Sequence, residues 1–184
     1  KHPDMKLHIQ MHDSDETTQC ILNNQAEIGV IGKEVLNRKI ISERLCKDEL
    51  VLAMPVHHPL AWQKSITVQE LAGTAFIARE HGSGTLDIVE KALLRHSGKS
   101  LPQFNVIAEM GSAEAVKEAI LAGLGVSILS IFAVRRELSQ GLLTTVKIID
   151  CPMERYFYFI YRKNFPFRKH HQHFLEVARS YRPL

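Results

Sequence analysis

Apolar and polar positions along the chain predict an alternation of strands and helices. Residues 6–11 alternate apolar and polar side chains in the manner of a strand. Ser14 then stands where a helix N-cap is expected, and acidic residues follow it in the first turn of a helix that reaches about Asn24. The apolar run at 26–32, bounded by glycine, is typical of a buried parallel strand. A strand, a helix and a buried strand form a βαβ unit, which predicts a parallel sheet.

The middle of the chain repeats this alternation after two extended segments at 40–44 and 49–54. A short helix with a capping box of Thr67 and Glu70 follows these segments. The alternation then restarts, which favours a second lobe over a continuation of the first. The further elements expected here are strands at 74–78, 104–109 and 125–130, and helices at 86–96, at 113–122 and up to about Leu138.

The last strand and helix are expected to return to the first lobe. Residues 156–161 are the most strand-like segment of the chain, and an amphipathic helix follows from about 169 to 181. One strand and one helix cannot form a lobe alone, so the chain would cross between lobes twice and form a hinge that can close on a ligand. The sequence therefore predicts an α/β fold of two Rossmann-like lobes joined by two crossover strands. Lobe I comprises residues 1–56 and 152–184, and lobe II comprises residues 57–151.

Composition narrows the class of protein. The 184 residues are 45% hydrophobic and 23% charged, as in ordinary soluble domains, and the net charge of +3 is dispersed, which argues against a nucleic-acid-binding face. Cys20, Cys46 and Cys151 lie far apart without a CxxC motif, which argues against disulfides or structural zinc and favours a reducing cytoplasm. No apolar run approaches the roughly 20 residues that cross a bilayer, and no signal peptide opens the chain, so no membrane association is expected.

The segment Arg79–Thr85, between an expected strand and an expected helix, carries the strongest local signal for ligand binding. Glycines such as Gly84 let the backbone approach a ligand closely, the hydroxyls of Ser83 and Thr85 supply donors, and unpaired amides at a helix N-terminus attract an anion. The alternative is an ordinary strand-to-helix turn capped by Ser83 or Thr85. A phosphate-binding P-loop is excluded because the GxxxxGK[ST] spacing is absent.

Two further segments carry weaker signals. Gly111 and Ser112 stand where a helix begins after a strand, at the edge where open α/β sheets bind ligands, although plain N-capping by Ser112 is the alternative. Gly32 and Lys33 end the buried strand of the first lobe. Lys33 either contributes a charge to the cleft or is a solvated loop residue.

Neither a metal site nor a catalytic site is expected. Among the ten histidines, His170 and His173 are clustered, but they lie at i, i+3 on a surface helix with little carboxylate nearby. No GxSxG, HExxH or kinase-like motif is present. Glu80 beside His81 resembles an acid/base pair, but such neighbours are common by chance in loops. We therefore expect no enzyme activity, no metal and no cofactor.

Several stretches of the chain, taken in order, carry a family resemblance. The clearest is Gly111–Lys117 leading into Ala122–Leu129, and the loop Arg79–Thr85 is another. The remaining stretches are His2–Leu7, Gln25–Ile31, Asp48–Pro55, His57–Ala61, Glu70–Ala72 and Gly141–Leu143. Together they resemble the effector-binding domain of LysR-type transcriptional regulators over nearly the whole chain.

The resemblance implies two lobes of the type II periplasmic-binding-protein fold, with an effector in the cleft between them. It also implies a homodimer or tetramer, and DNA binding only through a helix-turn-helix domain that this chain lacks. The Glu-x-Gly-Ser-Gly-Thr loop is most similar to the branch that includes regulators of cysteine biosynthesis and carbon fixation, which sense small anions or metabolites. By this likeness Ser83, Gly84, Thr85 and Ser112 are expected to line the cleft.

Three departures from the family pattern change this expectation. The family's first strand and helix precede the stretch at which this sequence begins, so lobe I is expected to lack them. An arginine often follows the Gly-Ser-Gly-Thr motif, whereas Leu86 stands here, and Arg79 or Lys33 is expected to substitute for it. Ser130 stands where a proline often ends the Gly-x-Gly strand, and it offers an extra donor.

We therefore expect a cytoplasmic, non-catalytic regulatory domain that senses a small metabolite, expected to be an anion, and relays its binding to a DNA-binding domain. A periplasmic-type solute-binding protein for transport is the alternative, because it shares the fold.

Overall fold

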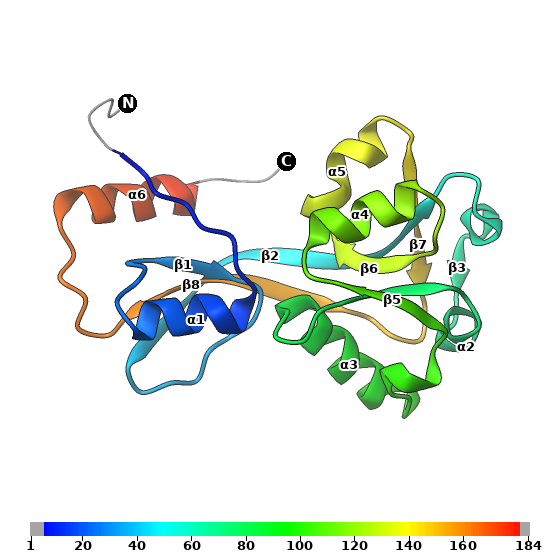
Figure 1. Ribbon diagram of the computed structural model, residues 1–184, viewed down its shortest axis with the longest axis horizontal. Helices are drawn as coiled ribbons and strands as arrows, with labels where there is room; N and C mark the ends of the chain where they lie inside the picture. The colour runs from blue at the N-terminus through cyan, green and yellow to red at the C-terminus, as the bar shows by residue number, and fades with distance from the viewer. Residues whose placement is uncertain (1–5, 181–184) are drawn as a thin grey trace. The chain divides into compact units, whose positions relative to one another are not determined.

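The computed structural model describes residues 6–180, and these residues fall into two compact units (Figure 1). Unit 1 contains the chain up to Cys46 and from Tyr156 onward, and unit 2 is the continuous stretch Lys47–Arg155. Strands β2 (Ile40–Pro55) and β8 (Glu154–Arg162) each run through one of these boundaries. The expectation of two crossover strands is thereby confirmed, while lobe boundaries near residues 56 and 152 stay a prediction.

Unit 1 is built on a short antiparallel pairing. Strand β1 (Gly29–Ile31) pairs with β8, with Gly29 opposite Ile160. Helix α1 (Ser14–Leu22) precedes β1, and helix α6 (Lys169–Ser180) ends the described chain. Asp13, and not the expected Ser14, caps α1, because its carboxylate accepts hydrogen bonds at 2.8 Å from two backbone N–H groups of the first turn. The core of unit 1 consists of Ile21, Ile31, Ile40, Tyr158 and Ile160.

The expectation of a strand at residues 6–11 is wrong for the described structure. These residues adopt no regular structure, and Leu7, Ile9 and Met11 are 62%, 80% and 83% exposed. A strand requires a hydrogen-bonded neighbour, and no segment among residues 6–180 pairs with this one. The alternating pattern alone therefore does not form the element.

Unit 2 contains the βα alternation that the sequence predicts. Strand β4 (Phe76–Arg79) pairs in parallel with β5 (Val106–Met110), and the bridge between Phe76 and Val126 places it parallel to β6 (Ser127–Ser130). Strands β6 and β7 (Leu143–Ile148) pair with β2 in the antiparallel sense. The other elements are β3 (Ser65–Ile66), α2 (Val68–Ala72), α3 (Gly84–Ser97), α4 (Ala113–Leu121), α5 (Ile131–Ser139) and the short 3-10 helices Pro59–Trp62 and Leu101–Gln103.

Helices cover both faces of this sheet. Successive residues of β4 belong to different apolar clusters, because Phe76 and Ala78 pack with Val89 and Leu93 of α3. Ile77 packs instead with residues of α4 and α5. Strands β4 and β6 are therefore buried on both faces, as their apolar composition predicts, whereas β5 is largely exposed.

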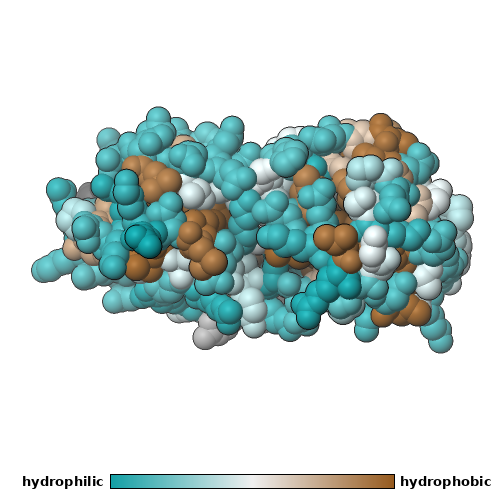
Figure 2. Space-filling model, turned by 90° about the horizontal axis from the view of Figure 1, so that it is seen from below, coloured by the Kyte–Doolittle hydropathy of each residue, from teal (hydrophilic) through white to brown (hydrophobic). Residues whose placement is uncertain are grey.

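Apolar side chains gather in small separate patches on the mostly hydrophilic face of Figure 2, as on ordinary globular domains. No helix within residues 6–180 combines the length and the apolar character that crossing a bilayer requires.

Candidate functional site

Three helices of unit 2 begin at the carboxyl ends of three neighbouring parallel strands. Strand β4 leads into α3, β5 into α4 and β6 into α5. Because the strands are parallel, the three helix N-termini lie at the same edge of the sheet. The backbone N–H of Glu80 donates to the carbonyl of Met110 at 3.2 Å, which holds the first two of these connections together.

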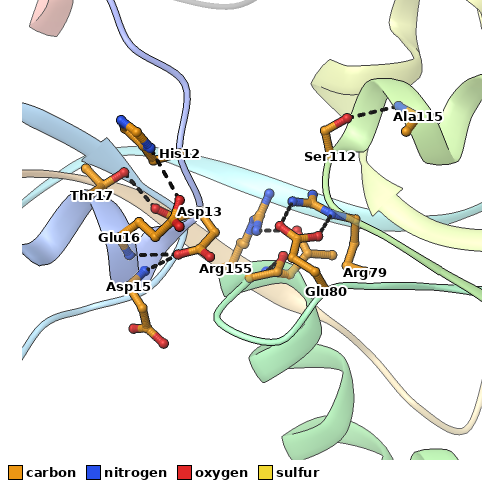
Figure 3. A network of polar contacts seen from close by, with 12 residues as sticks. His12, Asp13, Asp15, Glu16, Thr17, Arg79, Glu80, Ser112, Ala115 and Arg155 are labelled. Carbon is orange, nitrogen blue, oxygen red and sulfur yellow. Dashed lines mark hydrogen bonds and ion pairs between the residues drawn. The ribbon is translucent and has the colours of Figure 1, made fainter.

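A serine caps each of these helices. The hydroxyl of Ser83 accepts from the N–H of Thr85 at 3.3 Å, and Ser112 accepts from Ala115 at 3.1 Å (Figure 3). Ser130 accepts from the third helix, at 3.2 Å from the N–H of Phe132. The N-capping role that the sequence offered as the alternative is thus observed for Ser83 and Ser112. It is compatible with ligand binding, because a capping hydroxyl uses a lone pair and keeps its O–H as a donor.

A buried network of charged side chains contacts the first turn of α3. Asp48 of β2 and Arg155 of β8 form an ion pair at 2.6 Å, and their side chains are 0% and 6% exposed. Arg155 Nη1 also donates to the Thr85 hydroxyl at 2.9 Å. Ser130 donates to the other carboxylate oxygen of Asp48 at 2.8 Å, so its O–H is directed to Asp48 in this structure.

Burial outweighs the effect of the neighbouring carboxylate on Arg155, so the pKa of its guanidinium is lowered overall. Burial lowers the pKa of its guanidinium, the adjacent Asp48 carboxylate raises it, and the charge of Arg79 lowers it further. Arginine nevertheless stays protonated in proteins, so a positive charge is fixed next to the first turn of α3.

Arg79 and Glu80 form a second ion pair at this edge. Arg79 donates to both carboxylate oxygens of Glu80 at 2.6 Å (Figure 3). Burial raises the pKa of the Glu80 carboxyl, but hydrogen bonds from Arg79 and from the backbone, together with the charge of Arg79, outweigh it and lower the pKa overall. Glu80 is therefore held as a carboxylate by its neighbour, which fits an ion pair better than the acid/base pair with His81 considered above.

The remaining predicted residues, Gly32 and Lys33, lie in unit 1. Both follow β1, and Lys33 pairs with Asp15 of α1 at 2.8 Å, with 15% of its side chain exposed. Of the residues predicted from the sequence, the described structure brings Arg79, Ser83, Gly84, Thr85, Ser112 and Ser130 together in unit 2, whereas Gly32 and Lys33 belong to unit 1.

Sequence reasoning missed Asp48 and Arg155. The two residues are 107 positions apart, and no short motif joins them. The available signal was a charged residue just before each of two strand-like, apolar segments, Asp48 before Leu50–Met54 and Arg155 before Tyr156–Tyr161. Charges in such places are usually solvated, so only the folded chain shows that these two form a pair.

No metal-binding group of three or more His, Cys, Asp or Glu residues occurs within residues 6–180. The clustered histidines of α6 instead contact one another and other residues of unit 1. His171 is buried, and its ring contacts His170 at 3.0 Å and Glu27 at 3.3 Å.

Two α/β units connected by two strands define a domain of the type II periplasmic-binding-protein-like class. The family model of the LysR substrate binding domain matches residues 1–182, and the chain belongs to this family.

Curated relatives are transcriptional regulators. The chain is 35% identical to YeiE of Escherichia coli K12, an uncharacterized HTH-type transcriptional regulator, over 80% of this chain and 48% of YeiE. It is 30% identical to the HTH-type transcriptional activator CmpR of Synechocystis, over 89% of this chain and 53% of CmpR. The chain therefore spans about half the length of these relatives.

Solved structures share the fold. The regulatory domain of Synechocystis PCC6803 CcmR in complex with 2-PG superposes with a TM-score of 0.78 at 27% identity, over 91% of this chain and 79% of that domain. The effector-binding domain of QuiR in complex with shikimate superposes with a TM-score of 0.77 at 18% identity, over 90% and 76%, which shows the fold alone.

Proposed function

We propose that the chain is the effector-binding domain of a LysR-type transcriptional regulator and that it senses a small anionic metabolite. The observation that carries the proposal is the gathering of three serine-capped helix N-termini at one sheet edge, with the Arg155 guanidinium at the first turn of α3. The relatives that bear regulator names, and CcmR in complex with 2-PG, support it.

The chemistry of this edge favours an anion. Helix N-termini carry a partial positive charge and present backbone N–H groups. The capping serines Ser83 and Ser112 retain hydroxyl donors, and Thr85 accepts from a cation, which strengthens its own O–H as a donor. We assign Arg79, Ser83, Gly84, Thr85 and Ser112 to the site, and Ser130 to holding Asp48. Gly32 and Lys33 remain proposed contributors from unit 1.

The proposed role is regulatory and non-catalytic. Effector binding would favour one conformation of the domain, and a DNA-binding domain outside this chain would respond to it. Assembly as a homodimer or tetramer and a cytoplasmic location belong to the same proposal.

Thermal unfolding of the purified chain tests the anion site. The panel comprises sulfate, sulfite, thiosulfate, phosphate, acetylserine and common carboxylates. A ligand at 100 times its dissociation constant adds about 2.7 kcal/mol, which for a chain of this size raises the melting temperature by roughly 5–10 °C. We expect Thr85→Ala and Ser112→Ala to lose most of this shift.

Ser139→Ala serves as the matched control, because the Ser139 hydroxyl lies exposed at the end of α5 and bonds only locally, to the carbonyl of Arg136. An undiminished shift in both Thr85→Ala and Ser112→Ala would refute this placement of the site. The absence of a shift with every anion in the folded wild type would refute the anionic effector.

A further inference from the structure

The Asp48–Arg155 pair occupies the two ends of unit 2. Lys47 begins this unit and Arg155 ends it, so both members of the pair lie on the strands that lead into and out of it. The pair also contacts two of the three helix N-termini, α3 through Thr85 and α5 through Ser130. None of the residues predicted from the sequence explains why two full charges are buried here.

We propose that Arg155, positioned by Asp48, sets the charge preference of the effector site, so that the N-terminus of α3 favours a doubly charged anion over a singly charged one. The inference rests on the proposed function. It adds a specificity-determining residue and a positioning residue to the site.

The Arg155 guanidinium is nearer to the first turn of α3 than the Asp48 carboxylate is. Arg155 contacts Thr85 directly, whereas Asp48 contacts Arg155 from the other side of the guanidinium, at Nε. An anion at the first turn of α3 would therefore interact with the arginine more strongly than with the aspartate. Because both groups are buried, solvent screens this difference less than it screens surface charges.

When no anion is bound, Asp48 is needed to pair the buried charge of Arg155. An isolated buried guanidinium is costly, and a paired one with its hydrogen bonds satisfied is tolerated. The neighbouring Arg79 has the same arrangement with Glu80, so each cation at this edge has its own carboxylate. The two ion pairs leave this edge close to neutral overall, while Arg155 and the N-terminus of α3 itself place positive charge at the first turn of α3.

Removing either the negative or the positive charge of this ion pair tests the proposal, because the two changes should shift the anion preference in opposite directions. The probes are sulfate, which is doubly charged, and methanesulfonate, which has a similar shape and one charge. The measured quantity is the ratio of their dissociation constants, from calorimetric titration of the wild-type chain and of its variants. We expect Asp48→Asn to increase the preference for sulfate by roughly tenfold and Arg155→Gln to decrease it by roughly tenfold.

Two further variants separate charge preference from stability. The double variant Asp48→Asn/Arg155→Gln removes both buried charges and leaves no unpaired ion, so it remains foldable where a single variant is not. Its sulfate preference should fall several-fold below wild type, because the cation nearer to the site is gone. Glu137→Gln is the matched control, since it removes another buried carboxylate of unit 2 that pairs with Lys117 at 3.1 Å. It should leave the ratio unchanged.

The titrations of the wild-type chain and its variants either support or overturn the inference about Arg155. Wild-type discrimination that persists in the double variant and in every single variant that folds would show that the pair is only structural, and would overturn the inference while the anion site stands. A wild-type chain that binds neither probe would overturn the inference, and the wider anion panel described above would then decide whether the anionic effector falls with it. A ratio that moves in opposite directions in Asp48→Asn and Arg155→Gln, or falls in the double variant, supports it.

Discussion

Replacing Gly125 by alanine is expected to be among the most damaging single-methyl changes in unit 2. Gly125 lies two residues before β6, where the chain passes close to Ala75, the residue before β4. A Cβ atom at this position would lie 2.4 Å from the carbonyl oxygen of Ala75 and 3.0 Å from its carbonyl carbon. The obstacle is backbone, so no side-chain rotation relieves it.

The magnitude follows from the displacement that the methyl group requires. Real Cβ contacts essentially never fall below 3.0 Å, so the two strands must separate by at least about 0.6 Å at this point. The N–H of Val126 donates to the same Ala75 carbonyl at 2.9 Å, and Ile77 N–H donates to Val126 at 2.9 Å, so both hydrogen bonds would be stretched or lost. Overpacking costs about 1–3 kcal/mol, and the two disrupted buried hydrogen bonds cost about 1 kcal/mol each, which together gives about 3–5 kcal/mol.

Urea unfolding followed by circular dichroism measures this difference. Gly73→Ala is the matched control, because Gly73 lies in the same unit with φ −83° and its added Cβ would come no closer than 3.9 Å to the carbonyl of Glu70. The control should change the free energy of unfolding by less than about 0.5 kcal/mol. A loss below 1 kcal/mol in Gly125→Ala would refute the reasoning, since it would mean that β4 and β6 separate freely.

Two further predictions concern titratable groups. Hydrogen bonds from Arg179 lower the pKa of the Glu43 carboxyl below its usual 4.5, so its contribution to stability is present above pH 4.5 and is lost as the pH falls through the lowered pKa. The free energy of unfolding should therefore fall less steeply below pH 4.5 in Glu43→Gln than in wild type, and equal slopes in acid urea titrations would contradict this. Burial raises the pKa of the Cys151 thiol to about 11, so in a variant with Cys20→Ser and Cys46→Ser a thiol reagent at pH 8 should modify Cys151 only at the rate of unfolding. Rapid labelling of the folded variant would refute its burial.

The parallel core of unit 2 was predictable because its signals are local. Thr67 and Glu70 form the expected capping box, and Ser112 caps its helix as the pattern allows. Short apolar strands that end in glycine or serine leave few alternatives to a buried βα unit. The predicted helices at 86–96 and 113–122 differ from α3 and α4 by at most two residues at either end.

The elements that the sequence failed to predict depend on distant partners. Strand β2 is continuous over Ile40–Pro55, whereas the polar stretch around Asp48 suggested two separate segments. Strand β2 pairs with β8 and, from Leu50 onward, with β6 and β7, and the ion pair of Asp48 with Arg155 of β8 lies within the polar stretch. The reverse happens at residues 6–11, where a good local pattern has no pairing partner in the described chain. In both cases a long-range contact, or its absence, overrides local preference.

The discontinuity of unit 1 has a consequence for the order of folding during synthesis. Unit 2 is one uninterrupted stretch, so its contacts can form as soon as Arg155 has left the ribosome. Unit 1 must wait, because Glu43 and Tyr161, which share a hydrogen bond at 3.3 Å, are 118 positions apart. At translation rates of about 5–20 residues per second this interval lasts roughly 6–24 s. For that time the N-terminal segment, including β1 and its apolar side chains, has no β8 to pair with, and it is the part of the nascent chain most exposed to chaperones and proteases.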